Sequence, residues 1–173
     1  MYGAGRRKLK MEENVISSFR GDYRFLSNFW VFERPIIYKD LEFNCVENAY
    51  VCAKTTDPDL WVKVQAMTPG KAKAFGKEIF AEELSINPDW CDGFRVKLVT
   101  NLVTQKFLNN SVLAQKLLAT GNAELVEGNA WHDNFFGVCT CGNCPAEKML
   151  EGGAENYLGK ALMEVRNFLQ GRL

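Results

Sequence analysis

The chain has 173 residues, of which 47% are hydrophobic, and it carries 21 basic and 21 acidic side chains. This length and composition are sufficient for one globular domain with a sizeable core. A net charge of zero leaves no whole-surface field to hold a long nucleic acid. The composition therefore favours a small-molecule ligand, or nucleic acid only as the carrier of one modified base.

The N-terminal segment does not resemble a targeting or membrane segment. Four of the first ten residues are basic, but no apolar run follows them. A signal peptide needs such a run, and a membrane-spanning helix needs about twenty apolar residues. We therefore interpret residues 1–13 as a flexible leader and residues 14–173 as the folded domain. We expect a cytoplasmic protein without a membrane partner, and the sequence leaves its oligomeric state open.

The first quarter of the chain is typical of β structure. Residues 15–19 form a short β-prone run, and residues 20–24 have the composition of a turn or loop. Residues 36–43 predict a hairpin that turns at Lys39 and Asp40.

The rest of the chain is mainly helical. Caps, prolines at the first helical position and apolar periodicity predict helices over residues 44–54, 59–67, 68–77, 87–108, 111–120 and 154–169. Short strands are expected over 124–127 and 135–138, with a loop over 139–153. The pattern predicts an α+β fold: a single, mainly helical domain with a small antiparallel sheet.

The predicted helix 44–54 carries an unusual combination of side chains. Glu47 and Lys54 are seven residues apart, so they fall on one helical face, roughly 10 Å apart along the axis. Tyr50 lies on the same face. A structural explanation is also open, because Asn44 and Glu47 have the spacing of a capping box in which each side chain bonds the other residue's backbone N–H.

A set of short motifs resembles the NADAR (YbiA-like) family. Its opening motifs are approximately L-S-N-F and then S-V-E-H-A-Y-Q-A-x-K, and this chain has Leu26-Ser27-Asn28-Phe29 and then residues 46–54. Later motifs follow in the family order: Ala72-Lys73 with Gly76, Trp90, Lys106-Phe107, residues 117–121, Asp133 before Phe136-Gly137, and residues 158–166. Each motif alone is weak, whereas the ordered set covers residues 15–170 and is specific.

The resemblance implies a YbiA-like fold and N-glycosidase activity. Some family members cleave the base–ribose bond of phosphorylated ribosylaminopyrimidine intermediates of riboflavin synthesis, and others remove ADP-ribose from modified guanine. The expected partner is therefore a small phosphoribosyl or ADP-ribosyl substrate, and no cofactor is expected.

The catalytic residues expected from this resemblance are Glu47, Lys54 and Asp133. Cleavage of an N-glycoside builds positive charge on the sugar, which the Glu47 carboxylate can stabilise while it activates water. Lys54 is expected to act as an acid, hold a phosphate or form a Schiff base with an opened sugar; a solvated lysine is the structural alternative. Asp133 is expected to position sugar hydroxyls or serve as a second carboxylate, unless it only forms a turn.

The expected substrate-binding residues surround these groups. Ser27 and Asn28 suit hydrogen bonds to the base or ribose, and a loop arginine suits the phosphate, with Arg20 favoured over Arg24. The full set is Arg20, Ser27, Asn28, Phe29, Tyr50, Trp90, Phe136 and Gly137. For Trp90, a place in the core is the safer interpretation.

Two positions depart from the family pattern. Asn48 replaces the histidine after the motif glutamate, and Phe136 replaces a tryptophan. The first departure puts in doubt any proton transfer assigned to that histidine. Together they leave open a non-catalytic module that binds a nucleotide or ADP-ribose.

Three cysteines form a C-x-C-x-x-C cluster at Cys139, Cys141 and Cys144. Zinc normally takes four ligands, so His132, Cys91 or Asp133 would have to supply the fourth. We expect reduced thiols and no metal, with a zinc-stabilised interaction domain as the alternative. His132, the only histidine, is expected to be a bystander.

Overall fold

The structure is a computed structural model that describes residues 14–172, so the predicted leader lies outside the described residues. Its elements in chain order are β1 (Val15–Ile16), η1 (Gly21–Leu26), β2 (Ile36–Tyr38), β3 (Leu41–Phe43), α1 (Val46–Cys52), α2 (Pro58–Gln65), α3 (Pro69–Ala81), α4 (Asp92–Asn109), α5 (Ser111–Leu118), β4 (Glu124–Leu125), β5 (Gly128–Asn129), β6 (Val138–Cys139), η2 (Ala146–Lys148) and α6 (Tyr157–Gln170). The predicted α+β class with a small antiparallel sheet is confirmed.

The strands form three separate pairs. The predicted hairpin is present as the antiparallel pair β2–β3, in which Ile36 faces Phe43. Its turn residues Lys39 and Asp40 have φ of 50° and 62°, the left-handed conformation that tight hairpin turns require. The pairs β1–β4 and β5–β6 are parallel and join segments distant in sequence, which local patterns do not reveal.

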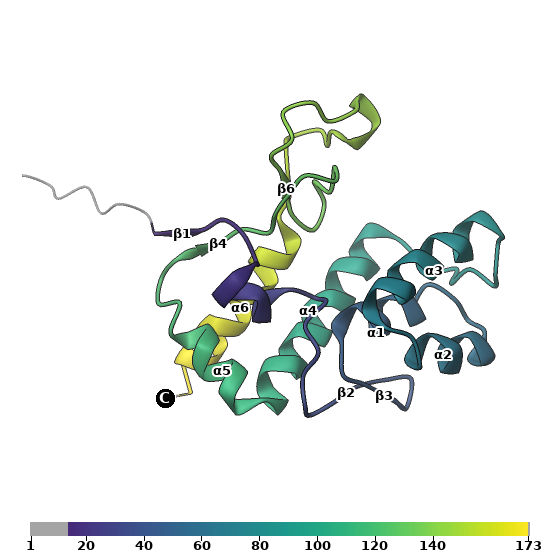
Figure 1. The fold of residues 1–173 in the computed structure, drawn as a ribbon, viewed down its shortest axis with the longest axis horizontal. Helices are drawn as coiled ribbons and strands as arrows, with labels where there is room; N and C mark the ends of the chain where they lie inside the picture. The colour runs from purple at the N-terminus through teal and green to yellow at the C-terminus, as the bar shows by residue number, and fades with distance from the viewer. Residues whose placement is uncertain (1–13, 173) are drawn as a thin grey trace, which may run out of the picture.

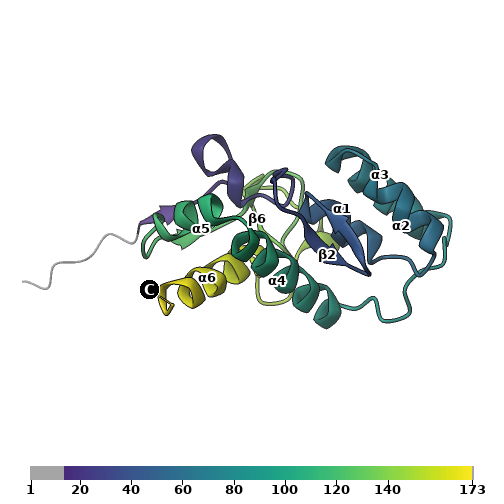
Figure 2. The same cartoon turned by 90° about the horizontal axis from the view of Figure 1, so that it is seen from below.

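Helix α4 lies at the centre of the molecule (Figures 1 and 2). It packs against α1, α5 and α6, while α1 also packs against α2 and α3. Figure 1 shows α1, α2 and α3 on one side of α4, with α5, α6 and the pair β1–β4 on the other. The connection from β6 to α6 stands away from the helices. Core side chains of the three central helices include Val46, Val51, Leu102, Phe107, Leu158 and Leu162.

Two predicted assignments are wrong, one for a local reason and one for a tertiary reason. Residues 20–24 belong largely to the 3₁₀ helix η1, because Arg20 is followed by a compact turn in which its carbonyl accepts from the Tyr23 N–H. Helix α4 begins at Asp92, not at residue 87. Asn87 is buried, and its side chain donates to the Ala53 carbonyl at 2.9 Å. This contact uses Asn87 to close a loop against α1, so it does not cap α4.

The C-terminal elements also begin later than predicted. Strand β6 starts at Val138, and α6 starts at Tyr157. Within residues 14–172 we find no helix with the length and apolar character needed to cross a membrane.

Candidate functional site

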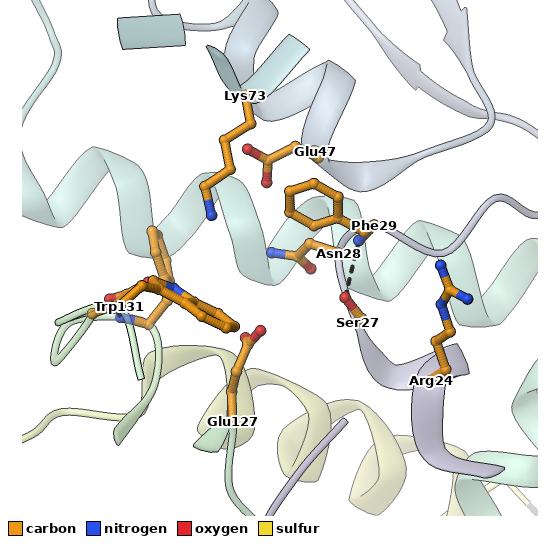
Figure 3. A pocket seen from close by; sticks show the side chains of 10 residues that line it. Arg24, Ser27, Asn28, Phe29, Glu47, Lys73, Glu127 and Trp131 are labelled. Atoms are coloured by element: carbon orange, nitrogen blue, oxygen red, sulfur yellow. Dashed lines mark hydrogen bonds between the residues drawn. The ribbon is translucent and has the colours of Figure 1, made fainter. Parts of the chain in front are cut away.

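A cavity of about 350 Å³ opens between α1, α3, the end of η1 with the loop that follows it, and the loops on either side of β5. Figure 3 shows side chains from these segments converging on it. Its lining residues are Arg24, Ser27, Asn28, Phe29, Glu47, Lys73, Glu127, Trp131, Asp133 and Phe136. The structure thus brings together six of the residues singled out from the sequence and adds four others.

Glu47 lies in the first turn of α1 and is free of the capping box predicted for it. The Asn44 amide instead donates to the carbonyls of Phe32 (2.8 Å) and Glu33 (3.0 Å). The Glu47 N–H donates to the Asn28 carbonyl at 3.0 Å, so the loop after η1 satisfies the helix end. This arrangement leaves the Glu47 carboxylate available to the cavity.

The ionisation of Glu47 reflects opposing influences. Burial raises the pKa of its carboxyl, the positive charges of Lys73 and Lys54 lower that pKa, and the negative charge of Asp133 raises it. Removal from water disfavours the charged form, whereas nearby cations favour it. Glu47 therefore depends on its lysine neighbours to remain a carboxylate.

Glu127 is a further carboxyl group in the cavity, and its role was not predicted from the sequence. Its pKa is raised to about 7, mainly by burial; the charges of Asp133 and Glu47 also raise it, while Lys73 and Lys106 lower it. Figure 3 shows Glu47 and Glu127 reaching into the cavity from opposite sides. A carboxyl with this pKa retains a proton in a large share of molecules at neutral pH, so it can serve as an acid.

Lys73 is the other functional group that was missed. It projects from α3, and its Nζ lies 5.2 Å from the ring centroid of Phe29 and 5.4 Å from that of Trp131. The Trp131 side chain is half exposed, at 50%. The motif Ala72-Lys73 contains this lysine, but the sequence alone does not indicate what the lysine contacts. Two aromatic faces and an ammonium suit a planar base beside an anionic group.

Asp133 forms the turn considered for it and also lines the cavity. Its Oδ1 accepts from the N–H groups of Phe135 (3.0 Å) and Phe136 (2.9 Å), which is the geometry of an Asx turn. The same residue lines the cavity and raises the pKa of both Glu47 and Glu127. The turn brings the Phe136 ring to the cavity wall.

The wall opposite Trp131 contains an unsatisfied acceptor. Asn28 lines the cavity, and its side-chain Oδ1 is buried without a hydrogen-bond partner in residues 14–172. Its backbone is fixed from behind, because its carbonyl accepts from the Glu47 N–H and the Cys45 thiol. An acceptor that is buried without a partner is costly, and Figure 3 shows the Asn28 amide nitrogen, not Oδ1, on the side of Lys73 and Trp131.

A buried lysine supports the neighbouring residue. Lys106 of α4 is fully buried, and its Nζ donates to the Ser27 carbonyl at 2.9 Å. Burial lowers the Lys106 pKa to about 7. The side chain thereby anchors the Ser27–Asn28 segment to the central helix.

Lys54 lies outside the cavity lining. Helix α1 ends at Cys52, so the helical spacing used to place Lys54 beside Glu47 does not extend to it. Its Nζ donates to the Gly76 carbonyl at 3.1 Å and lies 5.7, 5.3 and 5.8 Å from the ring centroids of Tyr50, Phe80 and Trp90. Burial lowers the Lys54 pKa to about 8, although the Glu47 charge opposes that shift. Lys54 thus lowers the Glu47 pKa through its charge without lining the cavity.

Tyr50 and Trp90 also lie outside the cavity lining. The Tyr50 hydroxyl accepts from Arg95 Nε at 3.1 Å, and its ring meets Phe136 edge to face at a centroid distance of 5.5 Å. The Tyr50 and Trp90 rings lie 5.2 Å apart. Tyr50 packs against Phe136, and Trp90 packs against the core, as favoured from the sequence.

The predicted roles of Arg20 and Gly137 also change. Arg20 is exposed and does not line the cavity, whereas Arg24, one turn later in η1, does. Gly137 is buried, and a Cβ there would overlap the Glu127 carbonyl oxygen and lie 2.9 Å from Asn129 Nδ2. Glycine is therefore required at residue 137 for close packing of the backbone behind the cavity.

Asn48 has a structural role. Its amide donates to the carbonyls of Val64 (2.9 Å) and Met67 (2.8 Å), which ties α1 to the end of α2. It does not line the cavity. Replacement of the family histidine at residue 48 therefore leaves the cavity's own side chains unchanged.

Comparison with known protein families identifies the family of this domain. Residues 17–170 match the NADAR domain. The chain belongs to the NADAR domain family. The cavity of this NADAR domain is lined by the LSNF segment, by Glu47 and by the Asp133–Phe136 turn.

Two relatives and one solved structure extend this comparison. A riboflavin biosynthesis protein of Vibrio vulnificus is 30% identical over 158 residues, which cover 81% of this chain and 40% of the relative. An N-glycosidase of Nostoc punctiforme is 33% identical over 108 residues, which cover 62% of this chain and 60% of the relative. The chain thus spans less than two thirds of either relative. The solution structure of the E. coli protein YbiA matches with a TM-score of 0.73 at 23% identity, covering 96% of this chain and 91% of that one. The YbiA-like fold is confirmed.

Proposed function

We propose that this NADAR domain is an N-glycosidase that hydrolyses the bond between ribose and a nitrogenous base. The observation that carries the proposal is the pair Glu47 and Glu127, which enter one cavity from opposite sides with raised pKa values. Two carboxyl groups that flank the scissile bond are the usual catalytic residues in glycoside hydrolysis. The activities named for the two relatives support the same reaction class.

The two carboxyl groups take different roles because their environments differ. Lys73 and Lys54 favour the ionised form of Glu47, whereas Glu127 titrates at about pH 7. We assign Glu47 as the carboxylate that stabilises the sugar cation and takes a proton from water, and Glu127 as the acid that protonates the leaving base. The water oxygen bonds to C1′ as the C1′–N bond breaks; one water proton passes to Glu47, the other stays on the new sugar hydroxyl, and the proton of Glu127 passes to the base nitrogen. Proton exchange with solvent then returns both carboxyl groups to their starting states.

The remaining lining residues suit a mononucleotide. Phe29 and Trp131 offer aromatic faces to the base, Asn28 offers its amide group, and exposed Arg24 at the rim suits the phosphate. A volume of about 350 Å³ lies at the small end of ligand pockets. It favours a phosphoribosylated aminopyrimidine of riboflavin synthesis over ADP-ribosylated guanine, the larger candidate.

Incubation of the full chain with each candidate substrate tests this proposal. We expect release of ribose 5-phosphate and free base from the diaminopyrimidine ribosyl phosphate, measured by chromatography and mass spectrometry. If only ADP-ribosylated guanine is cleaved, the proposed N-glycosidase activity stands and the proposed substrate is wrong. Binding of either compound without any product would refute the glycosidase and identify a non-catalytic binding module.

A further inference from the structure

Four potential metal ligands converge beside the cavity loop. His132, Cys139, Cys141 and Cys144 offer ligand atoms that all lie within 4.8 Å of one another, and all four residues are partly buried. His132 Nδ1 lies 3.4 Å from Cys141 Sγ and 4.0 Å from Cys139 Sγ. The Cys141 and Cys144 sulfur atoms are 3.3 Å apart. The sequence alone left three candidates for a fourth ligand, and the fold selects His132.

These distances fit a tetrahedral zinc ion. With zinc–sulfur bonds of about 2.3 Å, two sulfur ligands of one tetrahedron are about 3.8 Å apart, a value within the observed range of separations. Three thiolates and one imidazole are a frequent ligand set of structural zinc sites. A disulfide between Cys141 and Cys144 would not explain why His132 and Cys139 also lie close to these two sulfur atoms.

The surrounding backbone and side chains also suit thiolate ligands. Asn134 accepts from the Cys139 N–H at 3.0 Å and donates to Cys144 Sγ at 3.7 Å, while the Asn143 N–H lies 3.5 Å from Cys141 Sγ. Donors around a ligand sulfur orient it and stabilise its charge. His132 has a φ of 66°, an uncommon conformation for a residue other than glycine, and its ring lies beside the thiols.

We infer that His132, Cys139, Cys141 and Cys144 bind one Zn²⁺ ion as a structural clip. This inference replaces the expectation of metal-free thiols and of a bystander histidine, and it does not depend on the proposed N-glycosidase activity. The clip would fasten the long connection between β6 and α6 to the loop that carries Trp131 and Asp133. Zinc would then hold one wall of the cavity without touching the reacting bond.

Metal analysis of the full chain, purified under reducing conditions from medium that contains zinc, tests the clip. We expect one zinc per chain, with loss of nearly all of it in His132→Ala and Cys141→Ser variants. Cys91→Ser is the matched control, because Cys91 is exposed and lies outside the cluster, and it should keep full stoichiometry. An Asn134→Ala variant should bind zinc about 10–100-fold more weakly.

Cobalt substitution keeps the test decisive if a cluster variant fails to fold. Wild-type protein stripped by a chelator and titrated with Co²⁺ should develop intense visible bands of tetrahedral cobalt with thiolate ligands, saturating at one ion per chain. Absence of both stoichiometric zinc and these bands would overturn the inference. A Cys141–Cys144 disulfide found by mass spectrometry in the reduced preparation would overturn it equally.

Discussion

Single residues in the cavity derive their chemistry from burial and from a few charged neighbours. Glu127 illustrates this, because its pKa of about 7 follows first from burial and then from Asp133 and Glu47. Nothing in the local pattern Glu124-Leu125-Val126-Glu127 distinguishes this glutamate from a strand residue. Its environment is created by segments far away in sequence, so only the folded chain reveals it.

The raised pKa of Glu127 predicts a pH-dependent cost to stability. A carboxyl with a folded pKa of about 7 and an ordinary value of 4.5 binds its proton more tightly in the native state than in the unfolded state. Its stabilising effect is therefore present below pH 4.5 and is lost as the pH rises to about 7. We therefore compare the unfolding free energy of Glu127→Gln with that of wild type. The difference should shift in favour of the variant by about 1–2 kcal/mol between pH 4 and pH 8, a magnitude reduced for partial exposure.

Urea unfolding at both pH values measures this difference. Glu124→Gln is the matched control, because Glu124 is exposed on β4. An equal change in both variants would show that Glu127 ionises like a surface carboxyl.

The two lysines near Glu47 should affect activity in a fixed order. Lys73 has the larger lowering effect on the Glu47 pKa, followed by Lys54. Removal of either charge should therefore move the acidic limb of the pH–rate profile to higher pH, and Lys73→Met should move it further than Lys54→Met. Lys71→Met, an exposed change on α3, serves as the control.

If Lys54 instead formed a Schiff base with substrate, Lys54→Met would abolish turnover at every pH. Borohydride trapping would then label the wild-type chain. Either result would restore the direct role first considered for Lys54.

At the scale of elements, local signals predicted what local interactions determine. Helix α3 follows Thr68-Pro69, and the hairpin turns at Lys39 and Asp40, as expected from propensity alone. Asn44 and Asn87 have the sequence pattern of helix caps, but both side chains donate to distant carbonyls and cap no helix. Lys54 was misplaced because α1 ends before reaching it. Cap residues are informative only when tertiary contacts do not claim their side chains.

Gly137 tests how closely the elements behind the cavity must pack. A methyl group at residue 137 would overlap the Glu127 carbonyl, so Gly137→Ala must shift the backbone that carries this acid. We expect a loss of about 1–3 kcal/mol in unfolding free energy, together with reduced turnover. Thermal unfolding and product assays on the same preparations measure both.

Gly93→Ala is the matched control for this substitution. Its added Cβ would meet nothing within 4 Å, and residue 93 lies in the first turn of α4. It should change stability by less than about 1 kcal/mol, in the stabilising direction. Equal losses in the two variants would contradict the packing explanation.

At the scale of the whole molecule, the cavity exists because several distant segments meet beside α4. The resemblance of ordered motifs predicted Glu47, Ser27, Asn28, Phe29, Asp133 and Phe136 as site residues, and all of them line the cavity. It did not assign Lys73 or Glu127, because their roles follow from spatial neighbours. Lys106 shows the same limit, since its bond to the Ser27 carbonyl joins residues 79 positions apart.

The most direct test of this account compares wild type with Glu47→Gln and Glu127→Gln in release of ribose 5-phosphate from the diaminopyrimidine ribosyl phosphate. Loss of one positioned proton-transfer group costs about 10²–10⁴-fold. We therefore expect losses of that order in both variants, with substrate binding retained and Glu42→Gln, on β3, fully active. Undiminished cleavage by Glu47→Gln would contradict the central claim that this cavity hydrolyses an N-glycosidic bond through Glu47.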